Sequence, residues 1–186
     1  VMMVGQSIRL GEEDFGVAGG MESLSKAPFL LEKARAGYRY GNSTLVDSIL
    51  KDGLIDPFSN IHMGDCGEMC AEKYAITREQ QDAYALKSYQ RALEAQKGGK
   101  FVAEICEVDG LKEDEEPARA KLDKMGKLKA AFKAGGTITA ANASKLNDGA
   151  AALVLSSGKA AAGKKPLARI VDWATFSPEP QWFTTA

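Results

Sequence analysis

The hydrophobic and polar positions alternate between segments typical of helices and segments typical of buried strands. The segments that favour helices are residues 1–10, 44–51, 63–75 and 78–97. The segments that favour strands are residues 15–19, 102–108 and 166–175. Gly11 directly follows the first helical segment and predicts its C-terminal end. This alternation predicts an α/β layered fold with a mixed central sheet.

Residues 78–97 give the strongest helical signal in the chain. Thr77 is followed three residues later by Gln80, which is the spacing of a capping box at a helix start. Gly98 and Gly99 predict the end of the same helix. The helical period places Lys87, Gln90 and Glu94 away from one stripe of the helix, which consists of Ala83, Tyr84, Ser88, Arg91, Ala92 and Ala95.

A long stretch of weak periodicity separates two more regular parts of the chain. Residues 25–60 are rich in turn formers, and residues 109–135 are charged and irregular. This organisation predicts a loop domain over residues 25–145, inserted between core segments 1–24 and 146–186. Neither end of the chain carries a helix cap or a structural stop, so we expect it to begin and end inside a larger fold.

Three segments suit a ligand or a partner without requiring one. Residues 136–156 contain many small side chains, which leave room beside the backbone but also allow tight packing. The segregated charges of residues 113–133 suit a phosphate-bearing ligand, although a solvated surface has the same pattern. The basic-aromatic stretch at residues 31–45 is compatible with a solvated loop and with an oligomer contact. It contains Lys33, Arg35, Tyr38, Arg39 and Tyr40.

The composition is that of an ordinary globular protein, with 45% hydrophobic and 26% charged residues. A formal net charge of −1 provides no global field that would favour nucleic acid or an acidic membrane. No apolar run approaches the length needed to span a bilayer. We therefore expect neither nucleic acid nor a membrane as a partner.

The three cysteines, Cys66, Cys70 and Cys106, do not form a recognisable disulfide or metal pattern. An odd number of cysteines at these spacings is typical of a reducing compartment. Cys66 and Cys70 could share one helix face, but a metal site would need two further ligands, and His62 is the only histidine. Packed thiols are the favoured interpretation.

Three blocks in a fixed order resemble the thiolase family. They are VAGGMESLSKAP at residues 17–28, KDGLIDPFSNIHMGDCGEMCAEKYAITREQQDAYA at residues 51–85, and GTITAANASKLNDGAAALVL at residues 136–155. PLARIVDWA at residues 166–174 adds to the likeness, which covers nearly the whole chain. The HMG at residues 62–64 and the AANAS at residues 140–144 are more similar to acetoacetyl-CoA thiolases than to long-chain 3-ketoacyl thiolases.

The resemblance implies a fold and an activity. It implies part of a five-layered αβαβα subunit made of two similar halves, with a loop domain inserted in the first half to cover coenzyme A. It also implies an acyltransferase that condenses two acetyl-CoA molecules to acetoacetyl-CoA, or runs the thiolytic reverse. The alternatives are a degradative 3-ketoacyl-CoA thiolase and a non-catalytic module for coenzyme A binding or assembly.

The resemblance assigns no catalytic residue to this chain. The family's nucleophilic cysteine is expected just upstream of Val1, and its catalytic histidines in the second half of the subunit. Cys66, Cys70 and Cys106 do not stand in the nucleophile motif. The positions that match coenzyme A contacts are Leu54, His62, Met63, Arg119, Phe132, Ala140, Ser144 and Leu146.

The resemblance alone also carries our expectations for a cofactor, for the oligomeric state and for the cellular compartment. Some acetoacetyl-CoA thiolases bind potassium through a tyrosine whose place is taken here by Phe58. The carbonyls of Ala140, Ala141 and Ala143 could still face potassium, but the missing phenol oxygen argues against it, and no other cofactor is expected. A homo-oligomer, dimer or tetramer, is implied, with the basic-aromatic stretch matching the tetramer loop. Cytosol, mitochondrion and peroxisome all host the family.

Overall fold

The computed structural model describes all 186 residues, which form two compact units. The sheet unit comprises Val1–Gly53 and Leu146–Ser177, and the helical unit comprises Leu54–Lys145 and Pro178–Ala186. The domain boundaries expected from the sequence stay a prediction. No helix is both long enough and apolar enough to cross a membrane.

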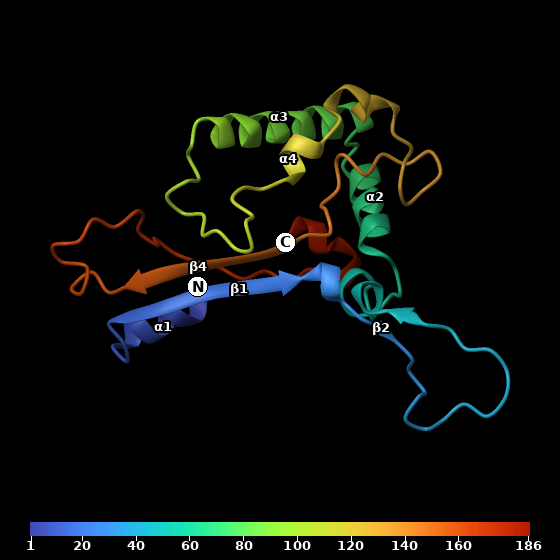
Figure 1. Cartoon of the computed structure of the whole chain (residues 1–186), viewed down its shortest axis with the longest axis horizontal. Coiled ribbons are helices and arrows are strands. Elements are labelled where there is room, and N and C mark those ends of the chain that lie inside the picture. Colours follow the sequence, from blue (N-terminus) through green and yellow to red (C-terminus); the bar gives the residue numbers. More distant parts are fainter. The chain divides into compact units, whose positions relative to one another are not determined.

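The sheet unit is built on two long antiparallel strands (Figure 1). β1 (Phe15–Ser23) pairs with β4 (Asp148–Ser156), in a register that runs from Phe15 opposite Ser156 to Ser23 opposite Asp148. The strand predicted at residues 15–19 is therefore confirmed, and it continues further. Gly19 permits the close approach of the two strands, because a Cβ there would lie 2.6 Å from the carbonyl oxygen of Ala151.

Helix α1 (Met2–Leu10), which the sequence predicted over residues 1–10, packs along these strands. It ends at Gly11, whose φ of 77° is left-handed and whose N–H bonds the carbonyl of Ile8. Ala18 of β1 and Leu155 of β4 are buried in this unit. The strands still leave apolar side chains exposed, among them Val17, Met21, Leu153 and Val154.

The chain leaves β1 through a short 3-10 turn, η1 (Leu24–Lys26), that is tied to the start of β4. The carboxylate of Asp148 accepts the backbone N–H of Ser25 at 2.9 Å and the Ser25 hydroxyl at 2.5 Å. These bonds from Ser25 lower the pKa of Asp148 below its usual value. The turn and the second strand of the sheet are thereby joined.

A second, smaller sheet follows in the same unit. β2 (Phe29–Leu30) pairs with β3 (Val46–Asp47), and a π-helical turn, η2 (Leu50–Leu54), comes next. The helix predicted over residues 44–51 is therefore wrong in position. Pairing with β2 keeps residues 46–47 extended, and the Asp47 carboxylate then accepts the N–H of Ile49 at 2.9 Å, which turns the chain into η2.

The helical unit contains two substantial helices and three short ones (Figure 1). The long ones are α2 (Met63–Lys73) and α3 (Arg78–Lys97), which confirms both predicted helices. The short ones are α4 (Glu116–Arg119), η3 (Leu122–Lys127) and η4 (Pro180–Thr185). Helices α4 and η3 contact α3, and η4 contacts α2.

The start of α3 has the geometry that the sequence predicted. Thr77 accepts the N–H of Gln80 at 3.3 Å, and the Gln80 side chain accepts the N–H of Thr77 at 2.9 Å. The stripe predicted on α3 is half-buried at Ala92 and Ala95, whereas Tyr84 on the same stripe is 79% exposed. The half-buried positions include Leu86, Tyr89 and Leu93, and the Tyr89 hydroxyl donates to Glu116 of α4 at 3.1 Å.

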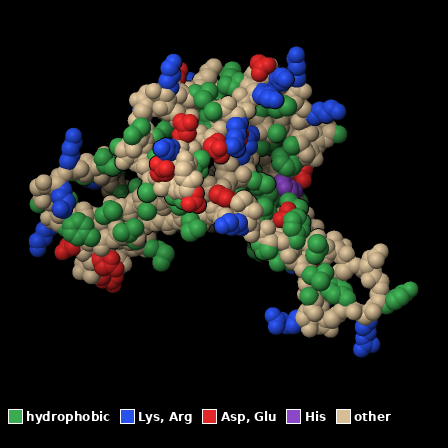
Figure 2. Space-filling view, viewed as in Figure 1, with side chains coloured by type: hydrophobic (Ala, Val, Ile, Leu, Met, Phe, Trp, Pro, Cys, Tyr) green, Lys and Arg blue, Asp and Glu red, His purple; other side chains and the backbone are tan.

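Two predicted strands do not form. Residues 101–105 make a turn in which the Phe101 carbonyl accepts two backbone N–H groups, and Val108 pairs only with the nearby Leu111. Residues 166–175 form no regular element. Alternation of apolar residues is insufficient for a strand, because a strand also needs a partner for its backbone groups. Many hydrophobic side chains accordingly lie at the surface (Figure 2).

Candidate functional site

His62 is held by its own helix, because it caps the start of α2. Its Nδ1 accepts the backbone N–H of Gly64 at 2.8 Å, which leaves Nε2 as the ring nitrogen that can donate. The backbone of His62 also pairs with Ile55 in an isolated antiparallel bridge. The imidazole is partly exposed and is the only purple side chain in Figure 2. These contacts fix one orientation of a ring that a ligand can reach.

Phe132 extends this wall with a second ring. Its ring is stacked on the imidazole of His62, with centroids 4.9 Å apart and planes inclined by 30°. The same ring lies directly on the backbone of Gly64, so that any Cβ at position 64 would overlap it. The segment that carries Phe132 is tied down beside it, because Ala131 donates its N–H to the carbonyl of Ile138 at 2.8 Å. Two segments far apart in sequence therefore share one aromatic surface.

A tight turn follows Phe132 and carries the predicted contact residues Ala140 and Ser144. It is called the binding loop (residues 137–144) after that prediction. Thr139 is completely buried at its centre. The N–H of Thr139 bonds the Asn142 side chain at 2.7 Å, and the Thr139 carbonyl accepts the N–H groups of Asn142 and Ala143. Ala140 and Ser144 remain exposed on this loop. The turn thus buries its polar centre and presents small residues outward.

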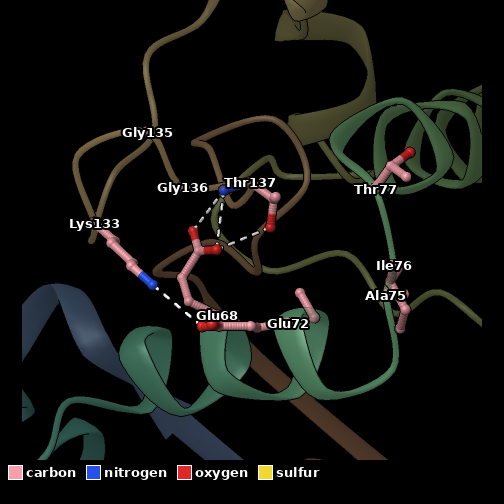
Figure 3. A pocket seen from close by; sticks show the side chains of 10 residues that line it. Glu68, Glu72, Ala75, Ile76, Thr77, Lys133, Gly135, Gly136 and Thr137 are labelled. Carbon is pink, nitrogen blue, oxygen red and sulfur yellow. Dashed lines mark hydrogen bonds and ion pairs between the residues drawn. The ribbon is translucent and has the colours of Figure 1, made fainter.

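The binding loop is anchored to both long helices. Glu68 of α2 is buried, and its carboxylate accepts hydrogen bonds from Thr137 (Figure 3) and also from the N–H of Ile138. Asp82 of α3 accepts the Asn142 side chain at 2.9 Å. An open depression of about 380 Å³ lies beside the Glu68 anchor and is lined by residues that include Glu72, Lys133 and Thr137.

Two opposing effects set the pKa of Glu68. Burial raises it, whereas the hydrogen bonds from Ile138 and Thr137 and the nearby charge of Lys133 lower it. The lowering effects dominate, so the pKa lies below the usual value of 4.5. Glu68 is consequently a carboxylate at neutral pH even though its side chain is withdrawn from water.

The structure brings only some of the predicted contact residues together. His62 and Phe132 touch, Met63 follows His62 at the start of α2, and Leu54 precedes the strand bridge to His62. Ala140 and Ser144 lie on the binding loop. The assignment of all eight residues to a ligand stays a prediction.

Two of the predicted residues have no described contact with the others. The guanidinium of Arg119, at the end of α4, pairs with the exposed Glu115 at 2.6 Å. Leu146 belongs to the sheet unit and is 65% exposed. Sequence reasoning also gave no role to Glu68, Asp82 and Asn142. A glutamate on the same helix face as Ala71 was the available signal, because a carboxylate on an apolar face needs hydrogen-bond partners.

The thiols and carbonyls considered for chemistry have ordinary structural surroundings. Cys66 is fully buried, and burial, followed by the charges of Asp56 and Asp65, raises the pKa of its thiol. A raised pKa disfavours the reactive thiolate. No group of three or more His, Cys, Asp or Glu side chains could hold a metal ion. The carbonyl of Ala140 accepts the ammonium group of Lys145.

Comparison with protein families matches residues 1–159 to the family described as thiolase, N-terminal domain. A probable acetyl-CoA acetyltransferase of Dictyostelium discoideum is 50% identical over 192 residues, covering 97% of this chain and 46% of that protein. The mitochondrial acetyl-CoA acetyltransferase of Mus musculus is 48% identical over 198 residues, covering 100% of this chain and 46% of that protein. The chain thus spans about half the length of these curated relatives.

Solved structures give the same result for the fold. An acetyl-CoA acetyltransferase from Syntrophomonas wolfei matches with a TM-score of 0.81 and 46% identity, covering 89% of this chain and 44% of that one. A thiolase from Ascaris suum, solved in complex with coenzyme A, matches with a TM-score of 0.82 and 44% identity over the same shares. The mixed α/β arrangement described above is therefore that of part of these structures.

Proposed function

Because the chain belongs to the thiolase family, we propose that it forms the coenzyme A-binding part of an acetyl-CoA C-acetyltransferase. The proposed reaction joins two acetyl-CoA molecules into acetoacetyl-CoA and CoA, or runs in the thiolytic direction. Its substrates are coenzyme A thioesters, and it uses no further cofactor. The proposed fold of the complete subunit is the five-layered αβαβα arrangement.

One observation carries this proposal. Nearly half of the residues are identical to those of proteins named acetyl-CoA acetyltransferases, and the likeness extends over the whole chain. A structural relative from Ascaris suum was solved with coenzyme A. Identity at this level, spread over both units, supports a shared ligand as well as a shared fold.

The surface built around His62 suits the parts of coenzyme A. The stacked rings of His62 and Phe132 offer an aromatic face to the adenine end and to the start of the pantetheine arm. Ala140 and Ser144 are small enough for a thin arm to lie along the binding loop, and the Ser144 hydroxyl can bond an amide. Arg119, whose side chain is mostly exposed, supplies a cation for a phosphate.

The proposed role of these residues is to bind and orient the thioester. Claisen condensation needs a thiolate to carry the acyl group, a base to move a proton and donors for the developing oxyanion. His62 does not act as the base in this proposal, because its Nδ1 is occupied by Gly64 and its ring by Phe132. Cys66 is not the nucleophile, because it is buried and its raised pKa disfavours the thiolate.

The proposal includes a homo-oligomer, either a dimer or a tetramer. The basic-aromatic stretch at residues 31–45 supports it, because Tyr40 is fully exposed and Tyr38 is also at the surface. Aromatic and arginine side chains of this kind are enriched where proteins meet.

The experiment is a thiolysis assay on the complete protein that includes residues 1–186. Coenzyme A-dependent cleavage of acetoacetyl-CoA is expected, and its absence would refute the proposal. Phe132→Leu should raise the KM for coenzyme A about tenfold, as expected for the loss of roughly 1.4 kcal/mol of binding. Tyr84→Leu is the matched control, because Tyr84 is exposed on α3.

Two other outcomes would redirect the assignment. Faster cleavage of long-chain 3-ketoacyl-CoA than of acetoacetyl-CoA would identify a degradative thiolase. Binding of coenzyme A without any turnover would identify a non-catalytic binding or assembly module.

A further inference from the structure

We propose that Glu68 is a positioning residue, which holds the binding loop in the shape that presents Ala140 and Ser144 to the pantetheine arm of coenzyme A. The inference rests on the proposed function. It adds a role for a residue that does not itself reach the ligand-facing side of the loop.

The Glu68 carboxylate is the point at which the loop is fastened to α2. The side chain is only 5% exposed. Its oxygens accept the backbone N–H of Thr137 at 2.8 and 2.9 Å, the Thr137 hydroxyl at 2.9 Å and the N–H of Ile138 at 2.8 Å. Figure 3 shows the carboxylate directed at Thr137 from the helix below. One side chain therefore fixes two consecutive peptide groups at the start of the loop.

The backbone on either side is shaped to admit this carboxylate. A Cβ at Gly136 would overlap the Glu68 carboxyl group, so only glycine fits before Thr137. Gly67, next to Glu68 on α2, lies against Ile138, and a Cβ there would be 2.6 Å from the end of the Ile138 side chain. Helix and loop are thus in direct contact at both positions.

A second set of bonds extends the anchor to the far end of the loop. The Thr137 hydroxyl, which donates to Glu68, accepts the Gln81 side chain at 2.8 Å. The Asn142 side chain donates to the Thr137 carbonyl at 3.1 Å and to Asp82 at 2.9 Å. Asn142 lies between Ala140 and Ser144, so a shift at Thr137 would be passed directly to the residues that face the ligand.

The same helix also fixes the opposite wall of the predicted site. His62 caps α2, and Glu68 stands on its second turn. The His62 ring and the binding loop are both held in place by α2. Glu68 therefore sets the spacing between the aromatic wall and the small residues of the loop. A site preorganised in this way loses less freedom when a flexible arm binds.

A carboxylate is required at position 68, because every partner is a donor. An ionised carboxylate is an acceptor only, whereas an amide carries two N–H donors of its own. In Glu68→Gln the amide oxygen can accept both N–H groups only if it takes the place of Oε1. The NH2 group then lies against the N–H and the hydroxyl of Thr137, and this hydroxyl loses the oxygen to which it donates. Because donors would face each other in a buried position, the loop is expected to move away.

The test compares Glu68→Gln with Glu72→Gln in the complete protein that includes residues 1–186. Glu72 is the matched control, because it lies one turn further along α2, is 76% exposed on its side chain and pairs only with Lys133 at 3.3 Å. Calorimetry would give the Kd for coenzyme A and for adenosine 3′,5′-bisphosphate, which lacks the pantetheine arm. Glu68→Gln should weaken coenzyme A binding about tenfold, equal to about 1.4 kcal/mol, and leave the bisphosphate and kcat nearly unchanged.

A milder pair of variants covers the case in which Glu68→Gln does not fold. Thr137→Val removes the hydroxyl that links Glu68 to Gln81, and Thr137→Ser keeps it. The valine variant should raise the KM for coenzyme A several-fold, and the serine variant should restore the wild-type value.

The outcomes separate this inference from the proposed function. Wild-type affinity for coenzyme A in Glu68→Gln, or in Thr137→Val if Glu68→Gln does not fold, would overturn it. Equal weakening of both ligands would also overturn it, because that result indicates a general structural defect. Failure of the wild-type protein to bind coenzyme A would refute the proposed function itself and this inference with it.

Discussion

Replacing Gly64 by alanine probes the contact between the start of α2 and the Phe132 ring. Three atoms of that ring would overlap a Cβ at position 64. Because non-bonded carbon atoms settle at about 3.5–4.0 Å, the ring must move by roughly 1 Å or more. That movement would disturb the stack on His62, whose centroid lies 4.9 Å away.

Three effects combine in the expected change of the free energy of unfolding of Gly64→Ala. Overpacking costs about 1–3 kcal/mol, and loss of an aromatic pair costs about 0.5–1.5 kcal/mol. Alanine in place of glycine in a helix returns about 1 kcal/mol. A net destabilisation of about 2 kcal/mol follows. With an unfolding entropy of about 2.1 cal/mol/K per residue, this lowers Tm by about 2–3 °C in a complete protein roughly twice as long as this chain.

Thermal denaturation of the complete protein checks the value. Gly126→Ala in η3 is the control, because nothing lies within 4 Å of its added Cβ. The cost should also vanish in a Phe132→Ala background, where the ring that opposes the Cβ is gone. The reasoning is refuted if Gly64→Ala is as stable as wild type, or if its cost is the same with and without the Phe132 ring.

Two further predictions concern α2 and α3. The lowered pKa of Glu68 stabilises the fold above its unfolded value near 4.5, and this contribution is lost as pH falls through the folded pKa. The stability difference between wild type and Glu68→Gln should therefore shrink from pH 7 to pH 3, measured by urea denaturation, whereas Glu72→Gln should differ little at either pH. Thr77→Ala should cost about 1 kcal/mol through loss of the cap, visible as a lower Tm. The exposed Ser88→Ala should cost nothing, and equal losses in the two variants would contradict the capping argument.

The elements that the sequence predicted well are those whose determinants are local. The start of α3 depends on Thr77 and Gln80, three residues apart, and the end of α1 depends on Gly11 alone. Such signals are complete within a few positions. They can be read without knowing what the element packs against.

The elements that were predicted wrongly depend on partners that lie far away in the sequence. Residues 102–108 and 166–175 have the composition of strands, but no neighbouring strand pairs with them. The packing of α3 against α4 and η3 was not predicted, because these two elements come from an irregular charged segment that gave no packing signal. The periodicity of the sequence describes one helix or strand by itself, whereas the burial of its side chains also depends on the element that packs against it.

The candidate site shows the same division. The resemblance pointed to His62, Phe132 and the binding loop, and the structure places His62 and Phe132 in contact. Glu68 received no role from the sequence, because its partner Thr137 is 69 residues away. Only the fold brings the two blocks of sequence together and explains why a carboxylate stands between them.

The pairing of β1 with β4 has a consequence for the order of folding. Ser25 and Asp148, at one end of the sheet, are separated by 123 residues, and almost all of the helical unit lies between them in the chain. Closing so long a loop is slow, whereas α2 and α3 can form from nearby residues. During synthesis β1 therefore emerges long before its partner, with Val17 and Met21 on a strand that has nothing to pair with. It is the segment of a nascent chain that a chaperone would need to shield.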